Sequence, residues 1–242
     1  MRILVLSDIH SNIVALNSVL EDAGLVDGVW CLGDLVGYGP EPNACVERIR
    51  ELPNLLCIIG NHDVAVTGLR NIDKFNDEAE TAVLITRSII SPDNAEYLKS
   101  LPETIETETA VLAHGSPRNP IWEYILDPLT AKMALAFIQK DIALVGHTHL
   151  PACFCYETPA DKVTKRLLKD REIVHIHNRT ILNPGSVGQP RDHDPRASYG
   201  IFDTTENTWQ LHRVAYDVAT VQKRIREIGM PEKHASRLTE GW

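Results

Sequence analysis

The first part of the chain alternates short apolar runs with segments of helical periodicity. Residues 2–8 (RILVLSD) are almost continuously apolar, as in a buried strand. Apolar residues then recur from Ile13 to Leu20 at the spacing of one helix face. Ser11 is a suitable N-cap for this helix, and Gly24 is a suitable stop. The pattern therefore predicts a strand followed by a helix.

The same alternation continues through the next three elements. A strand is expected over residues 26–34, a helix over 41–52 and another strand over 54–63. Strands joined by helices pair in parallel, and unbroken apolar runs indicate burial on both faces of the sheet. These segments predict a βαβαβ unit with a buried parallel sheet.

The middle of the chain is more polar and then returns to apolar runs. Residues 73–101 have a helical pattern, which indicates a helical cap or hairpin beside the sheet. Residues 109–115 (TAVLAHG) and 141–149 (DIALVGHTH) are predicted as further core strands, with a helix over 129–139 between them. The α/β alternation thus continues to residue 149.

Short β-type runs at hairpin spacing follow, and they predict a second, largely antiparallel sheet. The charged stretch 158–172 is expected to be a solvated excursion between two of these strands, and residues 217–228 are expected to form a terminal helix. The predicted strands cover residues 151–157, 172–178, 180–186, 197–203 and 208–216.

The composition is typical of an ordinary globular protein. The chain has 242 residues, of which 43% are hydrophobic, and no repeated or biased stretch, so we expect one domain over residues 1–242. No apolar run approaches the roughly 20 residues that span a bilayer, and the apolar segment at the start is too short for a signal peptide. We therefore expect a cytoplasmic protein without a membrane partner, whose five cysteines are reduced structural thiols.

The net charge of −9 argues against stable binding to a nucleic-acid backbone. An enzyme that gathers metal ions locally could still attack phosphates. The charge therefore restricts the partners without excluding phosphate chemistry.

Candidate metal ligands follow the predicted strands, at the point where each strand ends. In an open α/β sheet, ligand sites collect at the carboxyl ends of the strands. Taken singly, each residue has a structural explanation, such as a helix start, a turn or a packed imidazole. Their joint occurrence, with five of the ten histidines among them, indicates a site. The residues are Asp8, His10, Asp34, Asn61, His62, His114, His147 and His149.

His147 and His149 flank a single threonine in the stretch VGHTHL. In an extended segment, residues i and i+2 project from the same face, so both imidazoles would point the same way. That arrangement suits metal binding, although the pair could equally be the end of a loop.

Five sequence blocks occur in a diagnostic order: DIH, GDLVGYGP, GNHD, AHGS and GHTH. In this order the chain resembles the calcineurin-like metallophosphoesterase superfamily. Residues 183–192 (NPGSVGQPRD) also resemble the small prokaryotic YfcE-like phosphodiesterase branch. The resemblance implies an α/β fold, a two-layer β-sandwich of mixed sheets flanked by helices.

The resemblance also implies two divalent metal ions. Asp34 would bridge them, and carboxylate and imidazole ligands without thiolate suit hard and borderline metals. We expect Mn²⁺ first, with Fe, Ni²⁺ or Zn²⁺ as alternatives. The first ion would take Asp8, His10 and His149, and the second would take Asn61, His114 and His147.

The implied reaction is metal-dependent hydrolysis of a phosphate ester, with a phosphodiesterase as the first expectation. A hydroxide between the metals would be the nucleophile, His62 would protonate the leaving oxygen, and Asn61, His62 and Arg191 would contact the substrate. Alternatives are a phosphomonoesterase, a dinucleoside-polyphosphate hydrolase or a non-catalytic metal-binding scaffold. We expect the partner to be a small phosphoester substrate, which could be derived from a nucleotide. The sequence leaves open whether the protein forms a homo-oligomer.

Two features depart from or extend the family pattern. Gly37 and Tyr38 stand where the Ser/Thr protein phosphatase branch has Asp and Arg, which disfavours that branch and leaves open what orients His62. Asp63 is adjacent in sequence, but neighbouring side chains on an extended segment diverge. Residues 183–192 allow two interpretations, a tight turn that supports the site or a loop from which Arg191 or Arg196 reaches phosphate.

Overall fold

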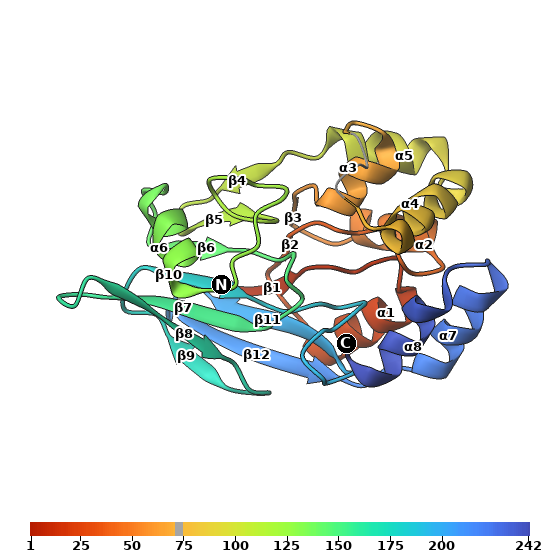
Figure 1. The fold of residues 1–242 in the computed structure, drawn as a ribbon. Helices are drawn as coiled ribbons and strands as arrows, with labels where there is room; N and C mark the ends of the chain where they lie inside the picture. Colours follow the sequence, from red (N-terminus) through yellow and green to blue (C-terminus); the bar gives the residue numbers. More distant parts are fainter. Residues whose placement is uncertain (71–74) are drawn as a thin grey trace.

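Two mixed six-stranded sheets form the centre of the molecule (Figure 1). A computed structural model describes residues 1–70 and 75–242. The first sheet has the strand order β3 (Leu55–Cys57), β2 (Gly28–Cys31), β1 (Arg2–Leu6), β11 (Ala197–Asp203), β12 (Thr208–Val214) and β9 (Ile173–His175). The second has the order β4 (Thr104–Glu106), β5 (Ala110–Ala113), β6 (Ile142–Leu144), β10 (Thr180–Asn183), β7 (Ala152–Glu157) and β8 (Lys162–Leu167).

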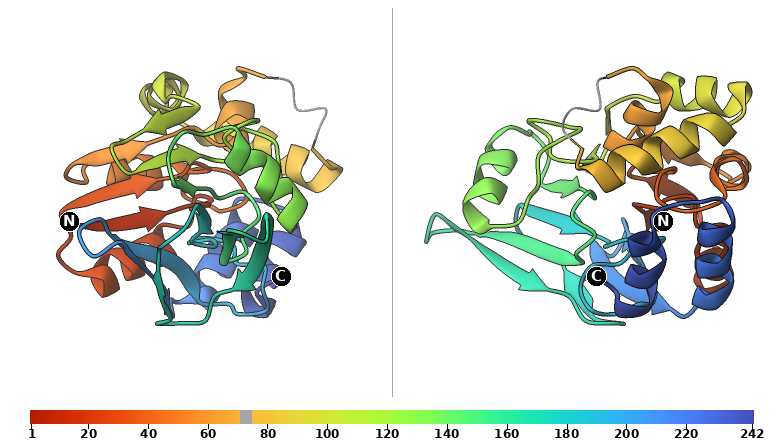
Figure 2. Two further views of the ribbon diagram at one scale, coloured as in Figure 1. Left: turned by 90° about the vertical axis from the view of Figure 1, so that its left-hand side faces the viewer. Right: turned by 45° about the vertical axis from the view of Figure 1, so that its right-hand side comes forward.

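Eight helices in the described part of the chain flank these sheets (Figure 2). Together with the two mixed sheets they confirm the predicted fold class. The helices are α1 (Ile13–Ala23), α2 (Pro42–Arg50), α3 (Asn61–Thr67), α4 (Asp77–Ile89), α5 (Pro92–Ser100), α6 (Pro128–Ala136), α7 (Val218–Glu227) and α8 (Glu232–Glu240).

The predicted parallel βαβαβ unit is confirmed. β1 pairs in parallel with β2, and β2 pairs in parallel with β3. In the second sheet β5, β6 and β10 are also parallel neighbours. The parallel strands of both sheets end at the same end of the molecule, which becomes important for the site.

The prediction of a separate antiparallel sheet is wrong. β11, β12 and β9 extend the first sheet beyond β1, while β7 and β8 extend the second beyond β10. Alternation along a strand shows which face is buried, but it does not show which neighbour the strand pairs with. Most pairings of the later strands are antiparallel as expected, but β10 pairs in parallel with β6, and the later strands complete both sheets.

Three local predictions also need correction or completion. The charged stretch 158–172 contains strand β8, whose polar residues suit an edge strand with little cover. Asn12, not Ser11, caps α1, because its side chain accepts a hydrogen bond of 3.0 Å from the Ala15 amide. Helix α8 lies beyond the predicted terminal helix and was not predicted.

Helix α3 was not predicted either, and its start replaces the end of the strand predicted over 54–63, but the remaining helices agree with their predicted segments. Gly24 ends α1, as predicted. Helix α7 falls within the predicted segment 217–228. Helix α6 falls within the predicted segment 129–139 except for its first residue, Pro128. The helical segment predicted over 73–101 contains α4 and α5. The first two residues of that segment lie outside the described residues.

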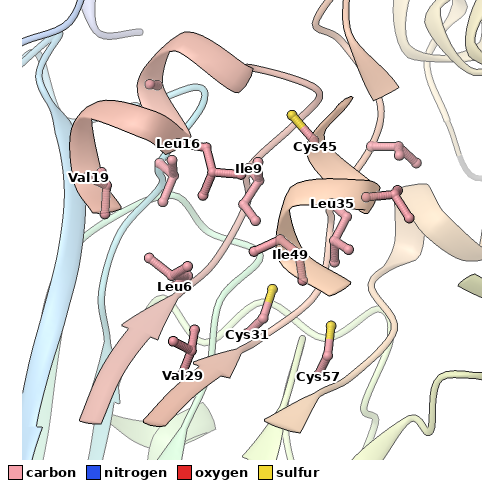
Figure 3. Close-up of a cluster of buried hydrophobic side chains, with 14 of the residues drawn as sticks. Leu6, Ile9, Leu16, Val19, Val29, Cys31, Leu35, Cys45, Ile49 and Cys57 are labelled. Atoms are coloured by element: carbon pink, nitrogen blue, oxygen red, sulfur yellow. The ribbon is translucent and has the colours of Figure 1, made fainter. Parts of the chain in front are cut away.

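Alternation along the central strands divides the interior into layers. In β1, Ile3 and Val5 face the second sheet, whereas Leu4 and Leu6 face the helices that cover the outer side. Figure 3 shows Leu6 among side chains of β2, β3, α1 and α2. A third cluster lies between the second sheet and α6. These layers fix the strand ends on which the site is built.

All five cysteines are free, and Cys31, Cys45 and Cys57 belong to the layer under α1 and α2 (Figure 3). No helix in residues 1–70 or 75–242 has the length and apolar character needed to cross a bilayer.

Gly200→Ala should destabilise the first sheet. An added Cβ at Gly200 in β11 would lie 2.2 Å from two ring carbons of the buried Trp209. Because the ring is enclosed, we expect the free energy of unfolding to fall by about 1–3 kcal/mol in urea denaturation. Trp209→Phe removes the opposing ring atoms, so the glycine substitution should cost less in that background. An equal loss in both backgrounds would contradict this contact.

Candidate metal centre

The predicted ligands meet where the parallel strands of the two sheets end. They follow β1, β2, β3, β5 and β6, and all are buried. Several of them have left-handed backbone, a conformation that costs a non-glycine residue free energy and concentrates at functional sites. The left-handed residues in this region include Asp8, His10, Asp34, His147 and His149, with φ values of 54°, 48°, 53°, 65° and 59°.

Asp8, His10 and His149 form the first cluster of potential ligands. The Nε2 atoms of His10 and His149 lie 3.0 Å apart, and Asp8 Oδ1 lies 3.2 Å from His149 Nε2. Each imidazole places its Nδ1 against a backbone carbonyl, that of Val36 for His10 and that of Gln189 for His149. A carbonyl only accepts, so both Nδ1 atoms must carry the proton and donate.

None of the three facing atoms of the first cluster carries a proton that it could donate in a hydrogen bond. Burial is the largest cause that lowers the pKa of His10 and of His149 well below the usual value, and Arg191 lowers that of His149 further, so the neutral form of both rings is favoured. Their Nε2 lone pairs therefore face each other, and Asp8 Oδ1 has no hydrogen-bond partner within the described residues. Three atoms that offer lone pairs, with no proton between them, are suited to coordinate a metal cation.

His114, Asn61 and His147 gather in a second cluster beside Asp34. His114 Nδ1 donates to the Leu32 carbonyl at 2.8 Å, and its Nε2 lies 2.9 Å from Asn61 Oδ1. The His147 ring centre lies 4.9 Å from that of His114, and His147 Nε2 has no hydrogen-bond partner among the described residues. Asp34, His114 and His147 each offer one ligand atom within 4.8 Å of the others.

Asp34 lies between the two clusters. Its Oδ2 is 3.7 Å from His10 Nε2 in the first cluster and 3.3 Å from His114 Nε2 in the second. Burial alone would raise the pKa of Asp34, but His114 and His62 outweigh it and lower the pKa well below its usual value. An ionised carboxylate with contacts on both sides is suited to bridge two cations.

His147 and His149 do not point the same way, so the prediction from an extended segment is wrong. β6 ends at Leu144, and the left-handed backbone at both histidines turns the chain between them. His149 consequently faces His10, while His147 faces His114. The two imidazoles belong to different clusters.

His62 lies beside the clusters and is positioned by packing. Its ring centre is 4.3 Å from that of Tyr38 and 4.9 Å from that of His10, and its amide donates to Asp34 at 2.8 Å. Gly37 leaves room for the ring, because a Cβ there would lie 2.6 Å from His62 Nδ1. One His62 nitrogen is also within 4.8 Å of ligand atoms of His10 and Asp34, so proximity alone would permit it as a ligand.

Asp63 supports the site by hydrogen bonds to two backbone amides. Its carboxylate accepts hydrogen bonds from the amides of Val36 and Gly60, at 3.1 and 2.9 Å, and does not contact the His62 ring. It thereby connects the loop that carries Tyr38 to the start of α3. Both residues lie in α3 rather than on the extended segment assumed from the sequence, and no hydrogen bond joins Asp63 to the His62 ring within the described residues.

The loop over 183–192 supports the centre. Asn183 donates to the Gly146 carbonyl at 2.7 Å, and Ser186 donates to the Asp8 carbonyl at 2.8 Å. Arg196 is engaged elsewhere, because its guanidinium pairs with Asp194 and Asp170. Arg191 Nη2 donates to Gln189, but its Nε has no partner within the described residues. Of the two arginines considered from the sequence, only Arg191 faces the site.

A pocket of about 500 Å³ opens above the clusters. Asn61, His62 and His147 lie at its base, and Arg191 and Arg237 also line it. The sequence did not single out Arg237 or the aromatic residues other than Tyr38 as parts of the site, since they come from loops and helices distant in the chain. The aromatic lining consists of Tyr38, Phe75, Trp122 and Tyr124.

We expect the two clusters to bind two divalent cations per chain and Mn²⁺ to raise the unfolding temperature, because a ligand of the native state stabilises it by mass action. Asp34→Asn removes the charge between the clusters and should abolish most of that increase, measured by calorimetry and metal analysis. Asp93→Asn, which removes an exposed carboxylate distant from the site, is the control. Two tightly bound metals in Asp34→Asn would contradict the bridging arrangement.

Comparison with known proteins agrees with this geometry. The model of the calcineurin-like phosphoesterase superfamily domain matches residues 1–207. An uncharacterized protein of Methanocaldococcus jannaschii is 38% identical over 246 residues, covering 99% of this chain and 98% of the relative. The phosphodiesterase YfcE of Escherichia coli is 27% identical over 213 residues, covering 84% and 88%.

Among solved structures, a metallophosphoesterase from Sphaerobacter thermophilus superposes with a TM-score of 0.92 at 43% identity. It covers 100% of this chain and 99% of that one. The family resemblance carried by the five sequence blocks is therefore confirmed. The chain belongs to the calcineurin-like phosphoesterase superfamily, a family that depends on a dinuclear metal centre, and is a hydrolase acting on phosphoester bonds.

Proposed function

We propose that the protein is a phosphodiesterase with two divalent metal ions. Asp8, His10 and His149 would bind one ion. Asp34 would bridge, and Asn61, His114 and His147 would bind the other. The observation that carries this proposal is the position of Asp34 between two buried clusters, of which the first contains the unpartnered Asp8 Oδ1 and the second the unpartnered His147 Nε2. When bound, the cations would lower the pKa of a water molecule and offset negative charge on the phosphate.

The pocket supports a diester more than a monoester. Its volume of about 500 Å³ leaves room for a substituent on each side of a phosphate. The aromatic rings of Trp122 and Tyr124 offer flat surfaces to a planar leaving group, which favours nucleotide-derived substrates. The relative YfcE is named a phosphodiesterase, which also supports this choice. A metal-dependent phosphomonoesterase is the second candidate.

His62 is suited to protonate the leaving oxygen. It lines the pocket, and its Nδ1 has no hydrogen-bond partner within the described residues. Burial lowers the pKa of His62 to about 4, and the Asp34 carboxylate opposes this shift. An anionic phosphate in the pocket would oppose it further and favour the protonated imidazole. Asn61 and Arg191 would hold the phosphate as hydrogen-bond donors.

The first test compares hydrolysis of bis-p-nitrophenyl phosphate and p-nitrophenyl phosphate. Chelated protein should be inactive, and Mn²⁺ should restore diester cleavage together with about two metals per chain. Metal content is measured in the same samples. Faster monoester cleavage would favour the phosphomonoesterase, whereas two bound metals with neither ester cleaved would favour a scaffold or a narrow substrate range.

His62→Ala should separate the acid role from metal binding. On diesters with poor leaving groups we expect a loss in kcat of roughly 10²–10⁴-fold, because their oxygen must be protonated as it departs. On p-nitrophenyl esters, which need little protonation, the loss should be much smaller. Metal content serves as the control. Equal losses on both substrates, or loss of metal, would count against the acid role.

A further inference from the structure

Arg237 is a charged residue in the pocket whose role the proposed reaction does not explain. It belongs to α8, outside residues 1–207 that the family model matches. Its side chain is only partly exposed, yet in residues 1–70 and 75–242 no carboxylate lies within ion-pair distance of it and its Nε has no hydrogen-bond partner. A buried Nε without an acceptor is unfavourable unless a ligand supplies one.

The neighbouring arginines show how unusual this state is. Arg224 pairs with Glu41, Arg226 with Glu232 and Arg213 with Asp192. Arg191 resembles Arg237, because within the described residues it also lacks a carboxylate partner and has an unsatisfied Nε. Within the described residues, the two arginines whose buried Nε lacks a hydrogen-bond partner therefore line the same pocket.

Arg191 and Arg237 also line a second hollow of about 270 Å³, together with Thr148, Leu150 and Trp242. The guanidinium of Arg237 lies 5.9 Å from the ring centre of Trp242, and that of Arg191 lies 5.7 Å from the ring centre of Tyr38. Burial and then repulsion from the charge of Arg191 lower the pKa of Arg237, while Tyr38 and Glu78 oppose this shift. An anion between the hollows would offset this repulsion.

We propose that Arg237, together with Arg191, forms a subsite for a second phosphate group of the substrate, next to the phosphate that is cleaved. Guanidinium groups bind phosphate through two parallel hydrogen bonds, and the described residues lining the pocket include no Asp or Glu that would repel it. The substrate would then carry at least two phosphates. This inference rests on the proposed function, since it assumes that the pocket receives a phosphoester.

The test measures binding to metal-loaded protein by titration calorimetry. The ligands are the α,β-methylene analogue of ADP, which carries two linked phosphorus groups, and AMP, which carries one. Arg237→Gln should weaken binding of the ADP analogue at least tenfold and that of AMP less than threefold. Arg237→Lys, which retains the charge without the fork of donors, should give an intermediate loss and guards against misfolding of the glutamine variant.

Arg226→Gln is the matched control. It removes the same charge from α7, where Arg226 pairs with Glu232 away from the pocket, and should change neither affinity by more than twofold. Equal weakening of both ligands by Arg237→Gln, or no weakening, would overturn the subsite. Hydrolysis of bis-p-nitrophenyl phosphate by the same wild-type sample tests the proposed function separately. If the wild-type protein does not hydrolyse this ester, the proposed function is wrong. The calorimetry still decides whether Arg237 distinguishes a ligand with one phosphate from a ligand with two.

Discussion

Buried lone pairs that face one another without a proton are the constraint on which this structure depends. His10 and His149 have their Nε2 atoms 3.0 Å apart, each oriented by a hydrogen bond from Nδ1 to a backbone carbonyl. Such a contact is unfavourable in the protein alone and favourable around a cation. The surrounding chain must therefore hold the ligands together in the absence of attraction between them.

The fold meets this requirement through the conformation and hydrogen bonds of the backbone, which hold these segments in place. The candidate ligands lie on short segments that leave buried parallel strands, and several of them have left-handed backbone. Ser186 and Gly188 bond to the carbonyl of Asp8, and Asp63 ties the loop after β2 to the start of α3. The packed layers on either side of the first sheet resist movement of these segments. Strain at the ligands is thus balanced by the rigidity of the sandwich.

The sequence predicted the early strands, and placed the candidate ligands at the ends of those strands, because both depend on local patterns. Asp8, Asp34 and His114 each follow an apolar run that becomes a strand, and parallel pairing brings such ends together. The partners of the later strands could not be predicted, since hydrophobic alternation does not specify which sheet a strand joins. The family resemblance assigned His147 and His149 to different ions, but their local backbone escaped prediction, because it has φ values that histidine rarely adopts. Arg237 was missed because only the packing of α8 brings it to the pocket.

The edge strand β8 has a consequence for the behaviour of the protein at high concentration. Its exposed side chains include Lys162, Lys165 and Arg166, which make the rim of the second sheet charged, although Lys162 pairs with Glu157 and Arg166 with Glu172. Like charges on an edge oppose the addition of an identical strand from another molecule. This protection is electrostatic and is screened as ionic strength rises. Concentrated salt therefore weakens the barrier to edge-to-edge aggregation, and dilute buffer preserves it.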